Sequence, residues 1–159
     1  MNIRQATTAD VAGLTSFGRR VLDETYLRTG WLAADEIAEM FDWWAPEYFA
    51  EALEGPHVIL VAENHDGIIG ATQTEILEPP RAVMWKLYVD RRHQARGIGS
   101  ALVDATMAAL PDSVVTWQTE YLATNEPAAR FYHSRGFQFD HDESYDRRIY
   151  RWVSRSLPG

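Results

Sequence analysis

Two glycines follow an apolar run at the point where the residue spacing changes from that of a strand to that of a helix. Val83–Val89 is mostly aliphatic or aromatic, and after a basic turn Gly97 and Gly99 open a stretch whose apolar residues recur at helical spacing. The first N–H groups of a helix lack carbonyl partners, and glycine lets a ligand approach the backbone closely. The stretch therefore predicts an anion site suited to phosphate oxygens on the backbone amides of residues 94–100.

Two familiar phosphate-binding motifs do not fit this turn. The four-residue glycine spacing and the lysine of a Walker loop are absent, and so are the three glycines and the later acidic residue of a dinucleotide fingerprint. One exposed helix end contributes only about 0.3–1 kcal/mol to anion binding. We therefore expect Arg92 or Arg96 to add positive charge, and a second surface to hold the rest of a nucleotide.

The hexamer Gln94–Gly99, QARGIG, resembles the diphosphate motif [QR]-x-x-G-x-[GA] of the GCN5-related N-acetyltransferases. A second stretch, from Trp117 to Phe137, is similar to the same family, which carries a glutamate-containing strand end, an Asn, a small residue, an aromatic–Tyr pair and Gly-Phe. The matching positions are Asn125, Ala128, Phe131, Tyr132, Gly136 and Phe137. Because two matches stand in the right order, the chain is identified as a member of this family over Val83 to about Phe139.

The resemblance implies an acetyl-CoA-dependent N-acetyltransferase that acts on a primary amine of a small cationic molecule, or of a protein or peptide. It further implies that the fourth and fifth strands splay apart to admit the pantetheine arm, that Asn125 contacts this arm and that Tyr132 lies by the sulfur. Exposed backbone of a strand can bond to the amides of the arm as an extra strand would. The residues expected to bind the cosubstrate are Leu87, Tyr88, Val89, Arg92, Gln94, Ala95, Arg96, Gly97, Ile98, Gly99, Ser100, Asn125 and Tyr132.

Two side chains are candidates for the proton transfers of amine acetylation. Tyr132 is the candidate acid, because a phenol keeps its proton at neutral pH and can give it to a departing thiolate. Glu120 lies five residues before Asn125, where some relatives that acetylate protein N-termini carry their base. Glu75 from the neighbouring hairpin, or a chain of waters, competes for the role of base. Two alternatives are a domain of the same fold that senses an acyl-CoA without turnover, and a scaffold with no nucleotide site.

Composition narrows the chemistry further. With 159 residues and no cysteine, the chain predicts a single domain, residues 1–159, in which acetyl transfer is direct within a ternary complex, because no thiol can form a covalent intermediate. The five histidines show no pairing at metal-ligand spacing, so no metal is expected. There is no apolar run of about 18 residues and no signal-peptide pattern, which predicts a cytoplasmic protein without membrane attachment.

The charge is unevenly distributed. The net charge of −8 argues against nucleic-acid partners, and eleven acidic residues lie between Asp23 and Asp66 against one basic residue, Arg28. These carboxylates either keep a helix face solvated or favour a cationic amine at an acceptor cleft. Trp43 and Phe49 lie off the apolar stripe of the helix in this region. Trp43, together with Trp31 in the preceding turn, is a candidate for the wall of an acceptor pocket or for a homodimer contact.

These groups must be positioned by a mixed, mostly antiparallel α/β (α+β) sheet of about six to seven strands flanked by helices, as the order of the patterns predicts. The predicted strands are Ile3–Thr7, His57–Glu63, Ile68–Leu77, Val83–Val89, Val114–Glu120, Phe137–Asp142 and Tyr145–Val153. The predicted helices are one capped by Thr8 and extending to about Tyr26, one from Ala33 that kinks or restarts at Pro46, one after Gly97 that ends near Pro111, and one starting at Asn125. A tight turn is expected at Asn64–Gly67, and a break at Glu78–Arg81.

Overall fold

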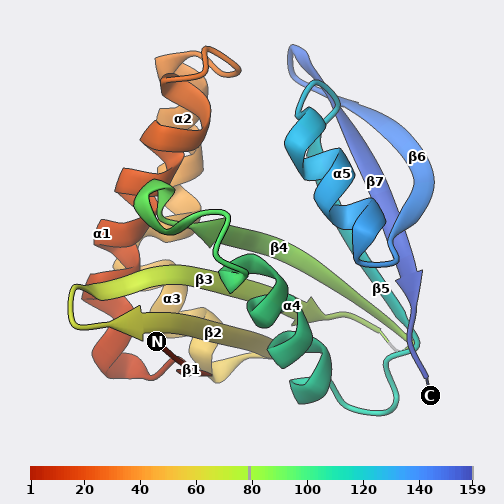
Figure 1. Ribbon diagram of the computed structural model, residues 1–159, viewed down its shortest axis with the longest axis horizontal. Helices are drawn as coiled ribbons and strands as arrows, with labels where there is room; N and C mark the ends of the chain where they lie inside the picture. The colour runs from red at the N-terminus through yellow and green to blue at the C-terminus, as the bar shows by residue number, and fades with distance from the viewer. Residues whose placement is uncertain (79, 159) are drawn as a thin grey trace. The chain divides into compact units, whose positions relative to one another are not determined.

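A seven-stranded sheet and five α-helices make up the part of the chain that this computed structural model describes, residues 1–78 and 80–158 (Figure 1). The strands are β1 (Asn2–Gln5), β2 (His57–Asn64), β3 (Gly67–Ile76), β4 (Arg81–Val89), β5 (Thr116–Leu122), β6 (Gln138–Tyr145) and β7 (Arg148–Ser156). The helices are α1 (Val11–Leu22), α2 (Ala34–Met40), α3 (Pro46–Glu54), α4 (Ile98–Ala109) and α5 (Glu126–Ser134). The strand order is β1-β2-β3-β4-β5-β7-β6, and β4 pairs with β5 in parallel. The predicted mixed, mostly antiparallel sheet flanked by helices is confirmed.

The chain divides into two compact units. Unit 1 comprises Met1–Gln73 and Lys86–Ala109, and unit 2 comprises Thr74–Trp85 and Leu110–Gly159. Strands β3 and β4 contribute residues to both units. The single domain expected for residues 1–159 stays a prediction.

In unit 1, the ring of Trp44 packs directly on Gly18 of α1. A Cβ added to Gly18 would lie 2.3 Å from two ring atoms of Trp44, so only glycine leaves room for the indole. Trp44 also contacts the rings of Phe17 and Phe49, at centroid distances of 6.2 and 5.8 Å. Phe49, which lies off the predicted helical stripe, is fully buried because α3 is a separate helix with its own inward face.

A second core in unit 1 fixes the helix that follows the glycine turn. Ile98 and Leu102 of α4 are buried against Leu60, Ala62 and Ile69 of β2 and β3. Figure 1 shows α4 lying over these strands. The apolar face of α4 therefore holds the first turn of the helix in place.

Unit 2 is a strand-helix-hairpin arrangement. Trp117 of β5 packs on Phe137 at a centroid distance of 5.4 Å, so one face of β5 is covered by α5 and the segment that follows it. The edge strand β6 is exposed along its whole length and pairs with β7, with a bulge between Phe139 and His141.

Several predicted boundaries were wrong by a few residues. Thr7, not Thr8, caps the 3-10 turn Thr8–Asp10 that leads into α1. Its hydroxyl accepts from the Ala9 amide at 3.3 Å, and its own amide donates to the Asp10 carboxylate at 2.8 Å. Helix α1 ends at Leu22 and a π-helical turn continues to Leu27. A restart at Pro46 was expected and is confirmed, since Pro46 is the first residue of α3.

The closing hairpin lies later in the chain than predicted. Its turn is centred on Asp146, which has a φ of 55°, and the charged residues before it belong to the exposed edge strand. Strand β5 starts at Thr116 instead of Val114, and the amides of Val115 and Thr116 both donate to the Pro80 carbonyl. The predicted turn at Asn64–Gly67 is present, with a φ of 100° at Gly67. The predicted break at Glu78–Arg81 includes Pro79, which lies outside the described residues.

No helix in the described residues is both long enough and apolar enough to cross a membrane.

Candidate functional site

The turn between β4 and α4 presents a run of unbonded backbone amides. The first amide that donates into α4 is that of Ala101, to the Gly97 carbonyl at 3.0 Å, and the amides of residues 95–100 donate to no described residue. Ala95 and Gly97 have φ values of 62° and 79°, and a Cβ added to Gly97 would meet nothing within 4 Å. Successive amides in such a turn form a concavity that suits an anion.

A buried carboxylate at the end of β4 anchors this turn. The Asp90 side chain is fully buried, accepts from the Arg92 amide at 2.9 Å and lies 2.9 Å from Nη2 of Arg20 on α1. Burial alone would raise the pKa of Asp90, but the hydrogen bonds from Arg92 and the charge of Arg20 outweigh it and bring the pKa to about 2. Sequence reasoning missed Asp90, although an Asp directly after a strand and before a turn is a known turn initiator.

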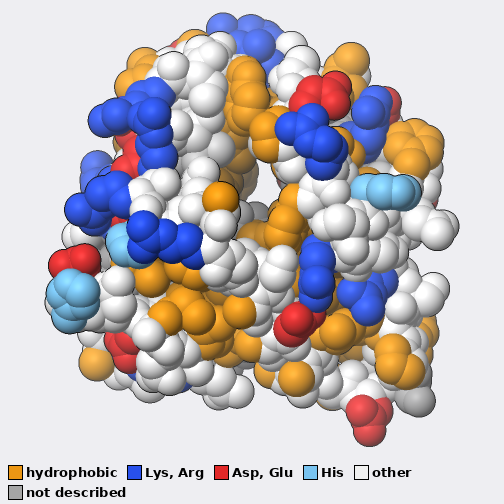
Figure 2. Space-filling model, viewed as in Figure 1, with side chains coloured by type: hydrophobic (Ala, Val, Ile, Leu, Met, Phe, Trp, Pro, Cys, Tyr) orange, Lys and Arg blue, Asp and Glu red, His pale blue; other side chains and the backbone are white. Residues whose placement is uncertain are grey.

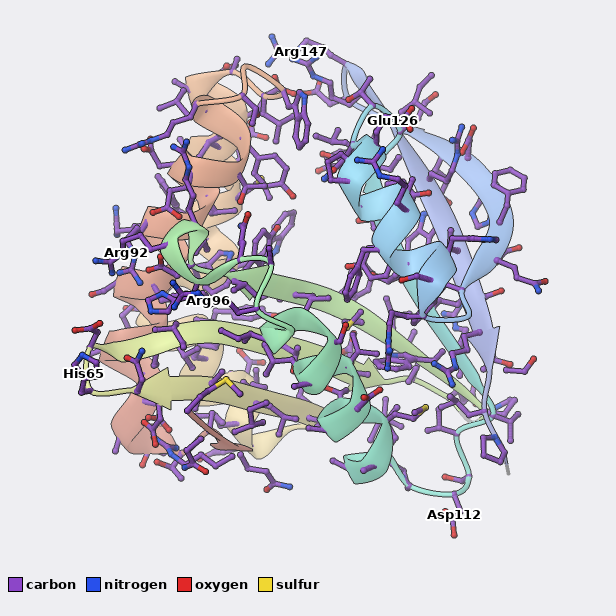
Figure 3. All side chains as sticks on the ribbon, in the orientation of Figure 1. His65, Arg92, Arg96, Asp112, Glu126 and Arg147 are labelled. Carbon is purple, nitrogen blue, oxygen red and sulfur yellow. The ribbon has the colours of Figure 1, made fainter. Side chains whose placement is uncertain are left out.

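The polar side chains of the turn take different positions. The Arg92 guanidinium is 69% exposed and lies 3.4 Å from Asp90, while Gln94 donates through Nε2 to the Val89 carbonyl at 3.0 Å. Figure 3 shows Arg92 and Arg96 on this turn, and in Figure 2 basic side chains gather over it and over the neighbouring helices of unit 1. Arg96 is exposed. Gln94 thus supports the turn, whereas both arginines can reach solvent.

The end of β4, which leads into the turn, makes side-chain contacts on both of its faces. Leu87 and Val89 pack against the core beneath α4, and the Tyr88 hydroxyl lies 3.0 Å from that of Tyr26. The pairing of β4 with β5 covers only Arg81–Met84. The backbone of Leu87–Val89 therefore lies beyond the residues that pair with β5.

Tyr132 lies inside unit 2 among other aromatic rings. Its side chain is 8% exposed, stacks on Tyr121 at 5.7 Å and meets Phe131 and Phe137 edge-on. Asn125 caps α5 by accepting from the Ala128 amide at 3.0 Å. Asn125 therefore orients the helix that carries Tyr132.

Glu120 is half-buried on β5, directly opposite Trp152 of β7. Burial raises the pKa of Glu120, the nearby charge of Glu143 raises it in the same direction, and together they bring it to about 7. Because neighbouring residues of a strand point to opposite faces, Glu120 lies on the face opposite to that of Tyr121 and α5. The two predicted catalytic groups thus belong to opposite faces of β5.

Glu75, the competing candidate for the base, lies on the same side as Glu120. Its Oε1 accepts from Nε1 of Trp85 at 3.0 Å, and the Trp85 ring meets the Trp152 ring at a centroid distance of 5.9 Å. Trp85 is 41% exposed. Sequence reasoning did not single out Trp85 or Trp152, because in a strand a lone tryptophan reads as core.

The two tryptophans expected at the wall of an acceptor pocket differ in exposure. Trp43 is 51% exposed, whereas Trp31 is half-buried.

A groove of about 440 Å³ lies on the α5 face of unit 2, beside Tyr121, Phe139 and Arg151, and neither predicted catalytic residue lines it. Among the residues that the structure describes, no three acidic or histidine side chains are grouped so as to hold a metal ion.

One family model matches more than half of the chain, and solved structures share its fold. A family model described as "Acetyltransferase (GNAT) domain" matches residues 55–139. The search of curated protein sequences found no match. Solved structures match over nearly the whole chain, among them the PaiA N-acetyltransferase of Thermoplasma acidophilum in complex with coenzyme A, at 18% identity and a TM-score of 0.82 over 98% of both chains. The ribosomal-protein-S18-alanine N-acetyltransferase of Escherichia coli matches at 17% identity and a TM-score of 0.76, covering 99% of this chain and 94% of the other. Ard1 of Thermoplasma volcanium matches at 18% identity and a TM-score of 0.75, covering 98% and 97%.

Proposed function

Because the chain belongs to the GNAT acetyltransferase family, we propose that it transfers the acetyl group of acetyl-CoA directly to a primary amine. The observation that carries the proposal is the open run of amides at residues 95–100, bounded by positive φ values at Ala95 and Gly97. The solved structure of PaiA holds coenzyme A on a similar fold, which supports a CoA-type cosubstrate here.

The diphosphate is assigned to the turn before α4. Its oxygens accept from the amides of residues 95–100, and Arg96 and Arg92 supply positive charge from solvent-exposed positions. Asp90 and Gln94 contribute to diphosphate binding indirectly, since their hydrogen bonds to the Arg92 amide and the Val89 carbonyl hold the turn in its conformation. The backbone of Leu87–Val89 is proposed to bond to the amides of the pantetheine arm.

The proposed cosubstrate-binding turn belongs to unit 1, and the two proposed proton-transfer groups belong to unit 2. Glu120 is the proposed base, because with a pKa of about 7 it is partly ionised at neutral pH and can accept a proton from an ammonium, directly or through water. Tyr132 is the proposed acid that protonates the departing thiolate. Alignment of amine and carbonyl provides the remaining rate acceleration without a covalent intermediate.

Glu120 is a better candidate for the base than Glu75. Glu75 already accepts from the indole N–H of Trp85, so one of its carboxylate oxygens is engaged. Glu120 has the raised pKa, which suits a group that must take up a proton near neutral pH.

A thiol-release assay tests the proposal. With acetyl-CoA present, we expect thiol release that depends on one class within a panel of polyamines, aminoglycosides, amino acids and N-terminal peptides. CoA binding without thiol release from any acceptor would instead support a regulatory acyl-CoA sensor. The absence of a thermal shift with CoA would leave a scaffold without a nucleotide site. We place the activity in the cytoplasm, and the acceptor as a small or protein-borne amine.

A further inference from the structure

Helix α1 continues into a π-helical turn, Asp23–Leu27, in unit 1. The amide of Arg28 donates to the Asp23 carbonyl at 3.1 Å and closes this wider turn. An α-helix would follow the buried Val21 with Thr25 on the same face, whereas the i→i+5 spacing of the turn allows Tyr26 to take that place. Turns of this kind are rare and occur frequently at functional sites, so the contacts of its side chains are informative.

Two side chains of the π-helical turn contact the segment Tyr88–Arg91, one at each end. The Tyr26 hydroxyl lies 3.0 Å from that of Tyr88, and the two rings meet edge-on at a centroid distance of 6.3 Å. Oε2 of Glu24 accepts from the amide of Arg91 at 3.1 Å. Tyr88 belongs to the strand end proposed to bond to the pantetheine arm, and Arg91 begins the turn to which the diphosphate is assigned. The π-helical turn therefore contacts both parts of the proposed cosubstrate site.

The contact of Glu24 lies where bonded amides give way to open ones. The amides of Arg92 and His93 donate to the carboxylate and the carbonyl of Asp90, each at 2.9 Å, and the amide of Arg91 donates to Glu24. The amides of residues 95–100 donate to no described residue. Glu24 thus satisfies the start of the turn and leaves the amides assigned to the diphosphate open.

The charge of Glu24 does not explain its position beside an anion site. The hydrogen bond to Asp90 raises the pKa of Arg92, and the charge of Glu24 acts in the same direction, so this carboxylate lies near the turn. A negative charge there repels a diphosphate. Arg20, four residues earlier on α1, forms an ion pair of 2.9 Å with Asp90. Glu24 is therefore placed to hold the backbone next to that ion pair, at some electrostatic cost to anion binding.

Tyr88 is held between two aromatic rings. Besides its contact with Tyr26, its ring meets the Trp44 ring edge-on at 5.6 Å, and Trp44 packs on Gly18 of α1. These contacts fix the side chain of Tyr88 on the α1 side of β4. They therefore also restrict the backbone of the strand end on which the pantetheine arm is proposed to lie.

We propose that Glu24 and Tyr26 are positioning residues, which hold the segment Tyr88–Arg91 in the conformation that binds the cosubstrate. The inference rests on the proposed acetyltransferase function and names two residues that serve it through Arg91 and Tyr88.

Three variants separate the position of Glu24 from its charge. Glu24→Ala should raise the Kd for CoA about three- to tenfold, because the Arg91 amide loses its acceptor. Glu24→Gln removes the same charge but keeps a side-chain oxygen that can accept, so it should bind CoA at least as tightly as the wild type. Asp23→Ala is the matched control, since it removes a carboxylate of the same turn that pairs with Arg28 at 3.8 Å, and it should not weaken CoA binding. Calorimetric titration of CoA measures these constants, and urea denaturation verifies that each variant is folded.

The tyrosine pair is tested by a double-mutant cycle. Tyr26→Phe and Tyr88→Phe each remove one hydroxyl of the pair, so each should raise the KM for acetyl-CoA about threefold with little change in kcat. The double variant should raise this KM no further, because both single variants remove the same contact.

The outcomes separate this inference from the proposed function. Equal Kd values for Glu24→Ala and Glu24→Gln, or tighter binding of CoA by Glu24→Ala than by the wild type, would overturn the role of Glu24. Additive increases of KM in the tyrosine cycle, or no increase, would overturn the role of Tyr26. Both results would leave the proposed function standing as long as the wild type binds CoA and releases thiol. No binding of CoA by the wild type would overturn the proposed function itself.

Discussion

The Thr119 hydroxyl donates a hydrogen bond of 2.8 Å to the Met84 carbonyl, across the last residue pair that joins β4 to β5. Both residues are buried, at 2% and 1% exposure. The next residues along these strands are Trp85 and Glu120. The bond therefore closes the paired part of the two strands directly beside the proposed base.

Removal of this hydroxyl should loosen the end of the pairing. We expect Thr119→Val to lower the free energy of unfolding by about 1–2 kcal/mol, because the buried Met84 carbonyl loses a donor at nearly constant volume. Urea denaturation measures the effect. Thr116→Val, at the half-buried start of β5, is the control and should cost less. Equal losses for the two variants would show that the bond to Met84 contributes nothing specific.

The positive φ of Gly97 should be essential for CoA binding. Gly97→Val should abolish measurable CoA binding, because a β-branched residue is strained at a φ of 79° and its side chain fills the space over the amides. Gly30→Val is the matched control, since Gly30 has a φ of 73° and nothing within 4 Å of an added Cβ. Both variants should lose similar stability in thermal melts, but Gly30→Val should bind CoA normally. Undiminished CoA affinity in Gly97→Val would remove the turn as the diphosphate site.

The raised pKa of Glu120 should make the free energy of unfolding depend on pH. The pKa of Glu120 in the folded protein, about 7, lies above the ordinary value of 4.5. The contribution of this carboxyl group to the free energy of unfolding is therefore fully present below pH ~4.5 and is lost as pH rises through about 7. Glu120→Gln should therefore become more stable than the wild type above pH ~7, by about 1–2 kcal/mol after allowance for solvent screening.

Urea denaturation at several pH values measures this difference, with the exposed Asp112→Asn as the control for loss of one negative charge. The same Glu120→Gln variant should lower turnover about 10²-fold or more if Glu120 is the base. A stability difference that stays constant from pH ~4 to ~8 would argue against a proton held by Glu120.

Lys86 should change the free energy of unfolding with pH in the opposite direction to Glu120. The chain's only lysine is 5% exposed, and its ammonium lies over the rings of Trp44, Tyr48 and Phe49 and donates to Gln73 at 2.6 Å. Burial lowers the pKa of Lys86 from 10.5 to about 7, while the aromatic faces act in the other direction.

A lowered pKa means that the burial penalty is full below pH ~7 and fades as pH rises toward the unfolded value. The stability of the wild type relative to Lys86→Met should therefore increase by about 2 kcal/mol between pH ~6 and ~9. Parallel pH curves for the two proteins would show that the ammonium keeps an ordinary pKa inside its aromatic cage.

Local patterns predicted much of this structure, and the failures have physical causes. The glycine turn was found because phosphate binding needs a particular backbone shape at a helix start, which Gly97 and Gly99 reveal in the sequence. The pairing of Asp90 with Arg20 joins residues 70 positions apart, and no local period encodes such a contact. Likewise, Trp85 and Trp152 come together through strand register, which depends on turn positions that the sequence placed several residues too early.

The hydroxyl of Tyr132 should matter for turnover and not for CoA binding. Tyr132→Phe should lower kcat by at least about tenfold, because the departing thiolate loses its proton donor, while CoA affinity stays nearly unchanged. The ring should remain stacked on Tyr121 and in contact with Phe137, since phenylalanine keeps the shape of the side chain. Tyr145→Phe, at an exposed position on β6, is the matched control for loss of a phenol. Stopped-flow measurement of thiol release and calorimetry with CoA separate the two effects. Wild-type turnover in Tyr132→Phe would mean that water or another group protonates the thiolate, and would leave Tyr132 as a packing residue of unit 2.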